Sequence, residues 1–296
     1  MSSNKPSLVE VDSLDIHVLI NDEIDQISPS PNPRTAKQGE NSHTLLFDSG
    51  PEEDVFEKNA QRLRLPMSDV GAIMLSHWHK DHSGGLLSAI RLAGKDKAIS
   101  EPVIVALPLD KPDYRGVMFD QPISLEPDPT MKEIQDAGGR TIVVDQACTV
   151  LEDTFLISGE IPRQTPYEGG IPGGIRYDLS KAKWTQDELI MEERFVMCKL
   201  KGRGLVIFTG YSHAGLINIA KNAKEIDNSP IYAIVGGYHL ADASPEKMES
   251  SMKDLKDLEP ELLMPGHCTG WRFKGLIDKE MPGQMAPIFG GTKYSL

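Results

Sequence analysis

A short segment with three histidines and an aspartate within six positions constrains this 296-residue chain more than any other feature. It is His77-Trp78-His79-Lys80-Asp81-His82, and it follows the apolar run Ala72–Leu75, which predicts a short buried strand. Side chains two apart on an extended chain point the same way, so we expect His77 and His79 to converge. The turn that follows can aim Asp81 and His82 at a second nearby point. Imidazole nitrogens and a carboxylate bind transition metals, so the segment predicts a metal site at a sheet edge.

This segment resembles the signature of the metallo-β-lactamase superfamily, His-x-His-x-Asp-His after a strand. Three other segments extend the resemblance: an early strand ending in Asp-x-Gly (Leu45–Gly50), a later strand ending in Thr-Gly (Leu205–Gly210) and a C-terminal histidine motif (Pro265–Gly270). More narrowly, Thr209–Gly215, Gly236–Leu240 and His267–Gly270 are similar to the branch that includes the archaeal dihydropterin–ribofuranosylaminobenzene phosphate synthases.

The resemblance implies a fold, a ligand set and a cofactor. The expected fold is a four-layer αββα sandwich of the α/β class, with residues 1–296 in one domain. The early-strand aspartate, Asp48, is expected to brace the metal loop. The motifs assign six metal ligands: His77, His79, Asp81, His82, His213 and His267. We expect one or two Zn²⁺ ions, with iron or manganese as alternatives.

One ligand position departs from the family pattern. Many members carry a metal-bridging aspartate directly after the late Thr-Gly, where this chain has Tyr211. The third histidine of the first metal normally lies upstream in a Pro-Gly-His stretch, where this chain has Glu160. Either His213 or Glu160 could fill the gap. We favour His213, because imidazole matches the other ligands and the following Ala-Gly turn leaves room.

Three residues are candidates for catalysis: Asp81, His239 and Tyr211. Zinc lowers the pKa of bound water to about 7, so hydroxide forms at neutral pH. We expect Asp81 both to ligate the metal and to orient this nucleophile. His239 ends an apolar strand, and we favour an acid–base or substrate-contact role over metal ligation. Tyr211 could donate to an oxyanion or could simply pack.

Composition excludes several partner classes. The net charge is −13 and there is no basic run, which disfavours nucleic acid and anionic membrane surfaces as partners. No apolar run approaches the ~18 residues of a membrane span. The three cysteines are widely separated and odd in number, which argues against a disulfide framework and predicts a reducing, cytoplasmic compartment. A small-molecule substrate is the inference, and a homo-oligomer is possible.

The rest of the chain predicts alternating strands and helices. An opening hairpin is expected from 8–11 and 15–21, and a loop over 26–41. Helices are expected over 52–63, 85–92, 216–223 and 245–258.

Two stretches interrupt this alternation, near 108–131 and 162–184. Both are rich in proline or glycine with interspersed aromatic residues, and we expect irregular insertions that cover the substrate. The candidate substrate-binding residues are Glu160, Tyr167, Tyr177 and Trp184. The glycines of the second stretch would permit hinge motion, and its aromatic rings could pack on a flat ligand.

These features predict a metal-dependent hydrolase that opens a lactam or lactone, or cleaves an ester, by attack of metal-bound hydroxide. Three alternatives stay open. The first is a phosphorylated pterin-precursor synthase, which would need cations for the phosphate, such as Lys80, Arg163 and Arg176. The second is an iron-dependent oxidoreductase with the same ligands. The third is a non-catalytic metal-binding protein.

Overall fold

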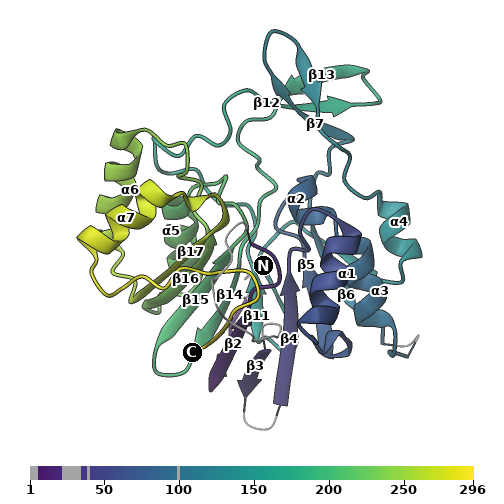
Figure 1. Ribbon diagram of the computed structural model, residues 1–296, viewed down its shortest axis with the longest axis horizontal. Helices are drawn as coiled ribbons and strands as arrows, with labels where there is room; N and C mark the ends of the chain where they lie inside the picture. Colours follow the sequence, from purple (N-terminus) through teal and green to yellow (C-terminus); the bar gives the residue numbers. More distant parts are fainter. Residues whose placement is uncertain (1–5, 22–34, 39–40, 99–100) are drawn as a thin grey trace, which may run out of the picture.

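The computed structural model describes residues 6–21, 35–38, 41–98 and 101–296, and within them two large sheets lie face to face between outer layers of helices (Figure 1). Apolar side chains from both sheets fill the space between them, among them Leu45, Met74, Val206, Val235 and Met264. This arrangement confirms the predicted four-layer αββα sandwich. The apolar runs of the sequence are therefore strands that are buried on both faces.

The first sheet carries the His77–His82 segment. Its strands, in spatial order, are β18 (Lys293–Ser295), β2 (Ser13–His17), β3 (Thr35–Gln38), β4 (Asn41–Phe47), β5 (Val70–Met74), β6 (Ile104–Pro108) and β9 (Arg140–Val144). Strands β4, β5, β6 and β9 are parallel neighbours. Helices α1 (Glu53–Arg62), α3 (Leu86–Gly94) and α4 (Met131–Asp136) pack on the outer face. The predicted helices at 52–63 and 85–92 are confirmed, and α4 was missed.

The second sheet carries the C-terminal motifs. Its strands are β10 (Cys148–Val150), β11 (Phe155–Ile157), β14 (Val196–Leu200), β15 (Gly204–Thr209), β16 (Ile231–Gly237) and β17 (Leu262–Gly266), with β1 (Glu10–Val11) paired to β14. Helices α5 (Leu216–Ile226), α6 (Pro245–Asp257) and α7 (Trp271–Glu280) cover its outer face. The helices predicted at 216–223 and 245–258 are confirmed, and α7 was missed. None of the helices in the described ranges is both long and apolar enough to cross a membrane.

The motif residues follow directly after the ends of parallel strands. Asp48 follows β4, and the metal segment follows β5. In the other sheet, β15, β16 and β17 run parallel and are followed by the segments containing His213, His239 and His267. The carboxyl ends of parallel strands share one edge of a sheet, so each sheet brings its motif residues to a single edge.

Two predictions about the N-terminal segment are wrong. The expected opening hairpin does not form, because β1 pairs with β14 while β2 pairs with β18 and β3 of the other sheet. The chain thus gives one strand to each sheet, and alternating apolar residues cannot show which partner a strand takes. The loop predicted over 26–41 contains strand β3, and its residues 26–34 and 39–40 lie outside the described part of the chain.

The prediction of irregular insertions is only partly right: residues 162–173 form no helix or strand, but the two insertions also contain strands. They pair with each other in a small antiparallel sheet of β13 (Lys183–Gln186), β12 (Gly174–Asp178), β7 (Tyr114–Met118) and β8 (Pro122–Ser124). This cap sheet, as we name these four strands, projects from the sandwich on the side of α2 (Lys80–Ser83) (Figure 1). Strands β7 and β12 are distant in sequence, so no local hairpin signal marks their pairing.

Two glycines near the metal segment give a test of the packing. A Cβ on Gly84 would lie 1.6 Å from the Pro51 carbonyl oxygen, whereas one on Gly94, at the end of α3, would meet nothing within 4 Å. We expect Gly84→Ala to destabilise the protein by about 1–3 kcal/mol, because backbone must move. Gly94→Ala should be neutral or stabilising by up to about 1 kcal/mol. Urea unfolding of both variants checks this, and equal effects would contradict the close approach.

Candidate metal centre

Six side chains converge in two groups of three where the strands of both sheets end. His77, His79 and His213 form one group, which we call the histidine group; Asp81, His82 and His267 form the second, the mixed group. Within each group the potential ligand atoms lie within 4.8 Å of one another. These are the six residues assigned from the motifs. Among the described residues, no carboxylate belongs to both groups.

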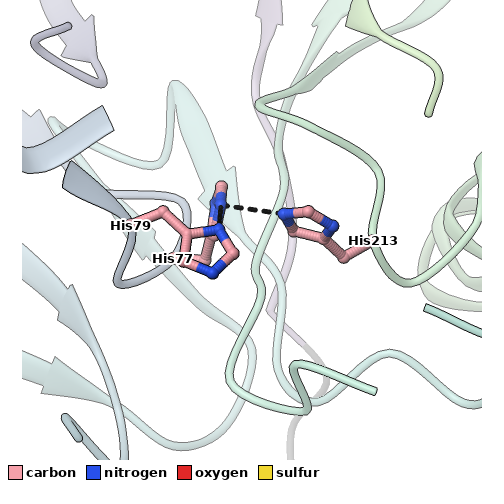
Figure 2. A group of neighbouring side chains, drawn as sticks. All are labelled: His77, His79 and His213. Carbon is pink, nitrogen blue, oxygen red and sulfur yellow. Dashed lines mark hydrogen bonds between the residues drawn. The ribbon is translucent and has the colours of Figure 1, made fainter. Parts of the chain in front are cut away.

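The histidine group has the spacing of ligands around one ion (Figure 2). The Nε2 atom of His77 lies 3.0 Å from Nδ1 of His79 and 3.1 Å from Nε2 of His213. Tetrahedral zinc places its ligand nitrogens about 3.3 Å apart, so the ring nitrogens fit a shared metal. His79 is extended, with φ −133° and ψ 142°, so the two-residue spacing brings the rings together as expected. Glu160, the alternative third ligand, is exposed and lies outside both groups.

The mixed group combines one carboxylate with two imidazoles. Oδ2 of Asp81 lies 3.5 Å from Nε2 of His82 and 3.6 Å from Nε2 of His267. Within the described residues, the buried Nε2 of His82 has no hydrogen-bond partner. An unsatisfied buried nitrogen is costly, and a metal ion held with Asp81 would satisfy it.

The carboxylate of Asp48 orients one imidazole in each group. Its Oδ2 accepts hydrogen bonds from Nδ1 of His82 at 2.7 Å and from Oγ of Ser76 at 2.8 Å. Because the Ser76 hydroxyl donates to Asp48, its oxygen is free to accept from Nδ1 of His77, 2.9 Å away. With both Nδ1 atoms as donors, Nε2 of each ring keeps its lone pair for a metal. A Cβ on Gly210 would lie 2.3 Å from Oγ of Ser76, so this relay requires glycine there.

The electrostatics of both groups also suit a metal cation. Burial lowers the pKa of His79 to about 3 and holds the pKa of His77 and His213 well below the usual range, so all three rings are neutral. Burial also opposes charge on His82, but the carboxylates of Asp48 and Asp81 outweigh it and raise its pKa to about 9. The mixed group therefore favours a positive charge, which a metal ion would supply in place of the proton.

Glu193 supports the histidine group and was missed by the sequence reasoning. Its buried carboxylate accepts hydrogen bonds from the backbone N–H groups of His213 at 3.0 Å and Ala214 at 2.6 Å. The next residue, Arg194, donates its backbone N–H to the Ser76 carbonyl oxygen at 2.8 Å. The segment therefore ties the loops of both sheets together. The signal in the sequence that could have pointed to Glu193 is the acidic pair Glu192-Glu193, which comes shortly before a buried strand.

Tyr211 lies between the two groups. Its ring stacks on His213, with centroids 4.3 Å apart and an interplanar angle of 11°, and it meets the His267 ring edge-on at 4.7 Å. The His239 ring is 5.0 Å from Tyr211 and belongs to neither ligand group. Burial lowers the pKa of His239 to about 4, so its imidazole is neutral at pH 7. The catalytic roles of both residues stay predictions.

Besides a cavity of about 230 Å³ that is bordered by Asp81, His82 and His267, two cavities open beside Tyr211. One of about 410 Å³ is bordered by His79, Asp81 and His213 and, on the side of the cap sheet, by the apolar side chains of Val117, Leu125, Ile171, Ile175 and Ile190. A second, of about 600 Å³, is bordered by Tyr167, His239, Lys247 and Cys268. Tyr211 borders both.

The predicted substrate-binding aromatic residues separate into two sets. Tyr167 borders the second cavity, and its hydroxyl donates to Asp254 at 2.8 Å. Tyr177 and Trp184 border neither of these cavities and instead pack together on the cap sheet, with centroids 5.2 Å apart. The two residues are cross-strand partners in β12 and β13, and neither strand was predicted from the sequence.

Asp48 gives a test of the metal groups. We expect Asp48→Asn to lower the affinity for Zn²⁺ by about 10- to 100-fold, because its single acceptor oxygen and its NH2 group cannot accept all three hydrogen bonds that the Ser76 N–H, the Ser76 hydroxyl and the His82 ring donate to Asp48. Competition with a chromophoric chelator measures the affinity. The exposed Asp54, which pairs with Lys58, provides the control variant Asp54→Asn, with an unchanged affinity expected. Equal affinities for Asp48→Asn and wild type would contradict the assignment.

The lowered pKa of His79 predicts a pH-dependent stability of the metal-free protein. Below about pH 6.5 the unfolded chain binds a proton at His79 that the folded protein, with its pKa of about 3, does not bind. The free energy of unfolding of wild type should therefore fall, relative to His79→Gln, as the pH drops from 6.5 toward 4. Urea titrations in a chelator measure the difference, and a constant difference would show that His79 is not buried as a neutral ring.

Comparison with known proteins agrees with this geometry. The model of the metallo-β-lactamase superfamily matches residues 38–176. The chain is 27% identical, over 255 residues that cover 83% of it and 82% of the relative, to the 7,8-dihydropterin-6-methyl-4-(β-D-ribofuranosyl)-aminobenzene-5′-phosphate synthase of Methanocaldococcus jannaschii.

Solved structures show the same fold. A metal-dependent hydrolase of the β-lactamase superfamily superposes with a TM-score of 0.73 at 25% identity, covering 95% of this chain and 98% of the other. A metallo-β-lactamase fold protein of Bacillus subtilis, 13% identical, has a TM-score of 0.52 over 96% of this chain and all of the other. The motifs, the sandwich and the paired ligand groups agree with these matches: the chain has the metallo-β-lactamase fold, and its residues 38–176 are similar to the metallo-β-lactamase superfamily.

Proposed function

We propose that the protein is a metal-dependent hydrolase whose small-molecule substrate binds between the two ligand groups and the cap sheet. The observation that carries this proposal is that residues of both groups, His79 and His213 from one and Asp81 from the other, border a single cavity. A substrate in this cavity would be within reach of both ligand groups.

The metals would supply the electrophile and the nucleophile. Bound zinc polarises a carbonyl oxygen and lowers the pKa of water to about 7. The side chain of Asp81 is 46% exposed, so beyond its contacts with His82 and His267 it can accept a hydrogen bond from a nucleophile in the cavity. The neutral imidazole of His239 would form a hydrogen bond to the reacting group and take part in proton transfer, and the phenol of Tyr211 would donate to an oxyanion.

The cavity supports a compact and partly apolar substrate. Its volume of about 410 Å³ lies in the usual range for small-molecule sites. The apolar side chains beside the cap sheet suit a hydrocarbon or aromatic body, and the ligand groups on the opposite side suit a polar reacting group. A lactone, a lactam or an ester combines these two properties. The net charge of −13 further disfavours a nucleic-acid substrate.

A phosphorylated pterin precursor is the second candidate, since the archaeal relative is named as a phosphate synthase. Two lysines favour it: Lys80 borders the first cavity, and Lys247 borders the second beside His239. The other predicted phosphate contacts are engaged elsewhere. Arg163 donates to backbone carbonyls, including that of Ile161 at 2.7 Å, and Arg176 pairs with Asp110.

The experiment is a substrate screen of Zn²⁺-loaded protein with lactones, lactams, esters and phosphorylated pterin precursors. We expect ring opening or ester cleavage that is lost on metal removal and restored by Zn²⁺. Asp81→Ala should abolish turnover, and His239→Ala should lower the rate by about 10²–10⁴-fold. Glu160, which was predicted to contact the substrate, is exposed and borders none of the three cavities near the groups, so Glu160→Gln provides a control that should keep the wild-type rate.

Other results of the screen are equally decisive. Turnover of the phosphorylated precursor alone would favour the second candidate. A near-native rate for Asp81→Ala would refute the role of this carboxylate in the reaction.

A further inference from the structure

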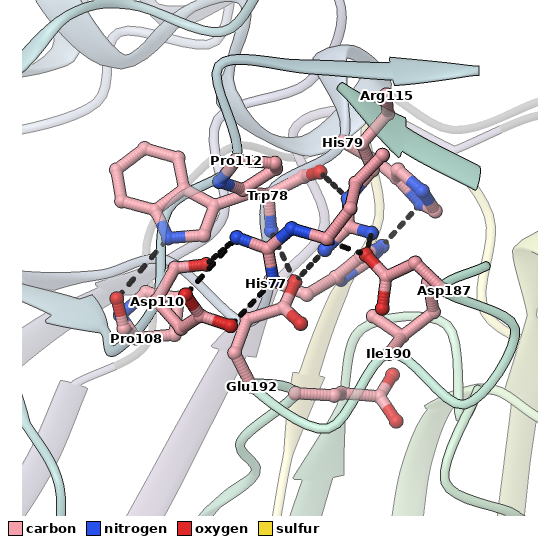
Figure 3. A network of polar contacts seen from close by, with 12 residues as sticks. His77, Trp78, His79, Pro108, Asp110, Pro112, Arg115, Asp187, Ile190 and Glu192 are labelled. Carbon is pink, nitrogen blue, oxygen red and sulfur yellow. Dashed lines mark hydrogen bonds and ion pairs between the residues drawn. The ribbon is translucent and has the colours of Figure 1, made fainter. Parts of the chain in front are cut away.

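Arg115 on strand β7 of the cap sheet contacts the metal segment directly. Its Nε donates a hydrogen bond to the carbonyl oxygen of Trp78 at 2.6 Å, and its side chain is only 3% exposed. Trp78 is the residue between the ligands His77 and His79 (Figure 3). The cap sheet therefore touches the backbone that joins two members of the histidine group.

Two carboxylates fix the guanidinium in place. One terminal nitrogen of Arg115 pairs with Asp187 and the other pairs with the buried Glu192. Oε1 of Glu192 also lies 3.4 Å from the backbone nitrogen of Trp78. The Arg115–Glu192 pair thus contacts both the N–H and the C=O of Trp78. A planar guanidinium with partners on both terminal nitrogens holds a single orientation.

The side chain of Trp78 is held as firmly as its backbone. The residue is fully buried, and its indole Nε1 donates to the carbonyl oxygen of Pro108 at 3.1 Å. Peptide groups are planar, so fixing the N–H and the C=O of one residue restrains the dihedral angles on either side of it. Those angles set the directions of the His77 and His79 side chains.

We propose that Arg115 is a positioning residue for the histidine group, which acts through the Trp78 backbone and makes metal binding at this group depend on the cap sheet. The inference rests on the metal-dependent function proposed above. Charge alone would act in the opposite direction: a guanidinium repels a metal cation, so its removal would strengthen metal binding. Loss of positioning would weaken binding. The sign of the change separates the two explanations.

Arg176 offers a matched control. It is the cross-strand partner of Arg115 in the pairing of β12 with β7, and its guanidinium also approaches Asp187, at 3.9 Å. Its side-chain hydrogen bonds go to Asp110. Replacing Arg176 therefore removes the same charge from the same sheet without removing the contact with Trp78.

The experiment compares Arg115→Gln, Arg115→Lys and Arg176→Gln with wild type in the full-length protein. Zn²⁺ affinity is measured by chelator competition, ligand geometry by the visible absorption of bound Co²⁺, and folding by urea titration. We expect Arg115→Gln to bind Zn²⁺ about 10- to 100-fold more weakly, with an altered Co²⁺ spectrum. Arg115→Lys keeps the charge but loses the planar guanidinium, so its Zn²⁺ affinity should lie between those of Arg115→Gln and wild type. Arg176→Gln should match wild type in both measurements.

Each alternative outcome has a defined meaning. Unchanged or tighter Zn²⁺ binding in folded Arg115→Gln would overturn the inference, and so would an equal loss in Arg176→Gln. If Arg115→Gln does not fold, Arg115→Lys carries the test, and wild-type affinity and spectrum in that variant would overturn it. Wild-type protein that takes up no metal would overturn the proposed function and this inference together, whereas the outcomes above overturn the inference alone.

Discussion

The hydrogen bonds of the Asp48 carboxylate connect the two ligand groups to the first sheet. One side chain at the end of β4 accepts from the backbone and hydroxyl of Ser76 and from the ring of His82. Through Ser76 it also sets the tautomer of His77. Without this carboxylate, a member of each ligand group would lose its orientation. The residue itself is held with φ +58°, a backbone conformation that non-glycine residues rarely adopt. The strained backbone at Asp48 therefore holds its carboxylate in position for the site.

The sandwich and the ligand groups could be predicted because their signals are local. His77, His79, Asp81 and His82 lie within six positions after an apolar run, and their two-residue spacing alone makes the first pair of rings converge. His213 could be preferred over Glu160 on ligand chemistry, and the structure places it 3.1 Å from His77. The buried parallel strands gave continuous apolar runs, which are the easiest strands to recognise.

The rest could not be predicted because it depends on contacts between distant segments. The acidic pair Glu192-Glu193 before a buried strand does not by itself show that the Glu193 carboxylate accepts from the backbone of His213, because a buried acidic residue cannot be told from a surface one in the sequence. The cap sheet pairs Arg115 with Arg176, two like charges whose direct pairing is unfavourable, and the carboxylates of Asp110, Asp187 and Glu192 form ion pairs with these two residues. The proline and glycine residues in these stretches predicted turns, so the short strands of three to five residues between them were not recognised.

The pairing of β7 with β12 has a consequence for the order in which the site is assembled during synthesis. Strand β7 leaves the ribosome about sixty residues before its partner, so it waits with an open hydrogen-bonding edge until β12 is made. His77 and His79 are made earlier still, while His213 and His267 come from the last third of the chain. Neither ligand group can be complete on a nascent chain that lacks its C-terminal sheet. A partial chain would therefore hold metal only weakly, and firm metal retention would mark the moment at which both halves of the sandwich have come together.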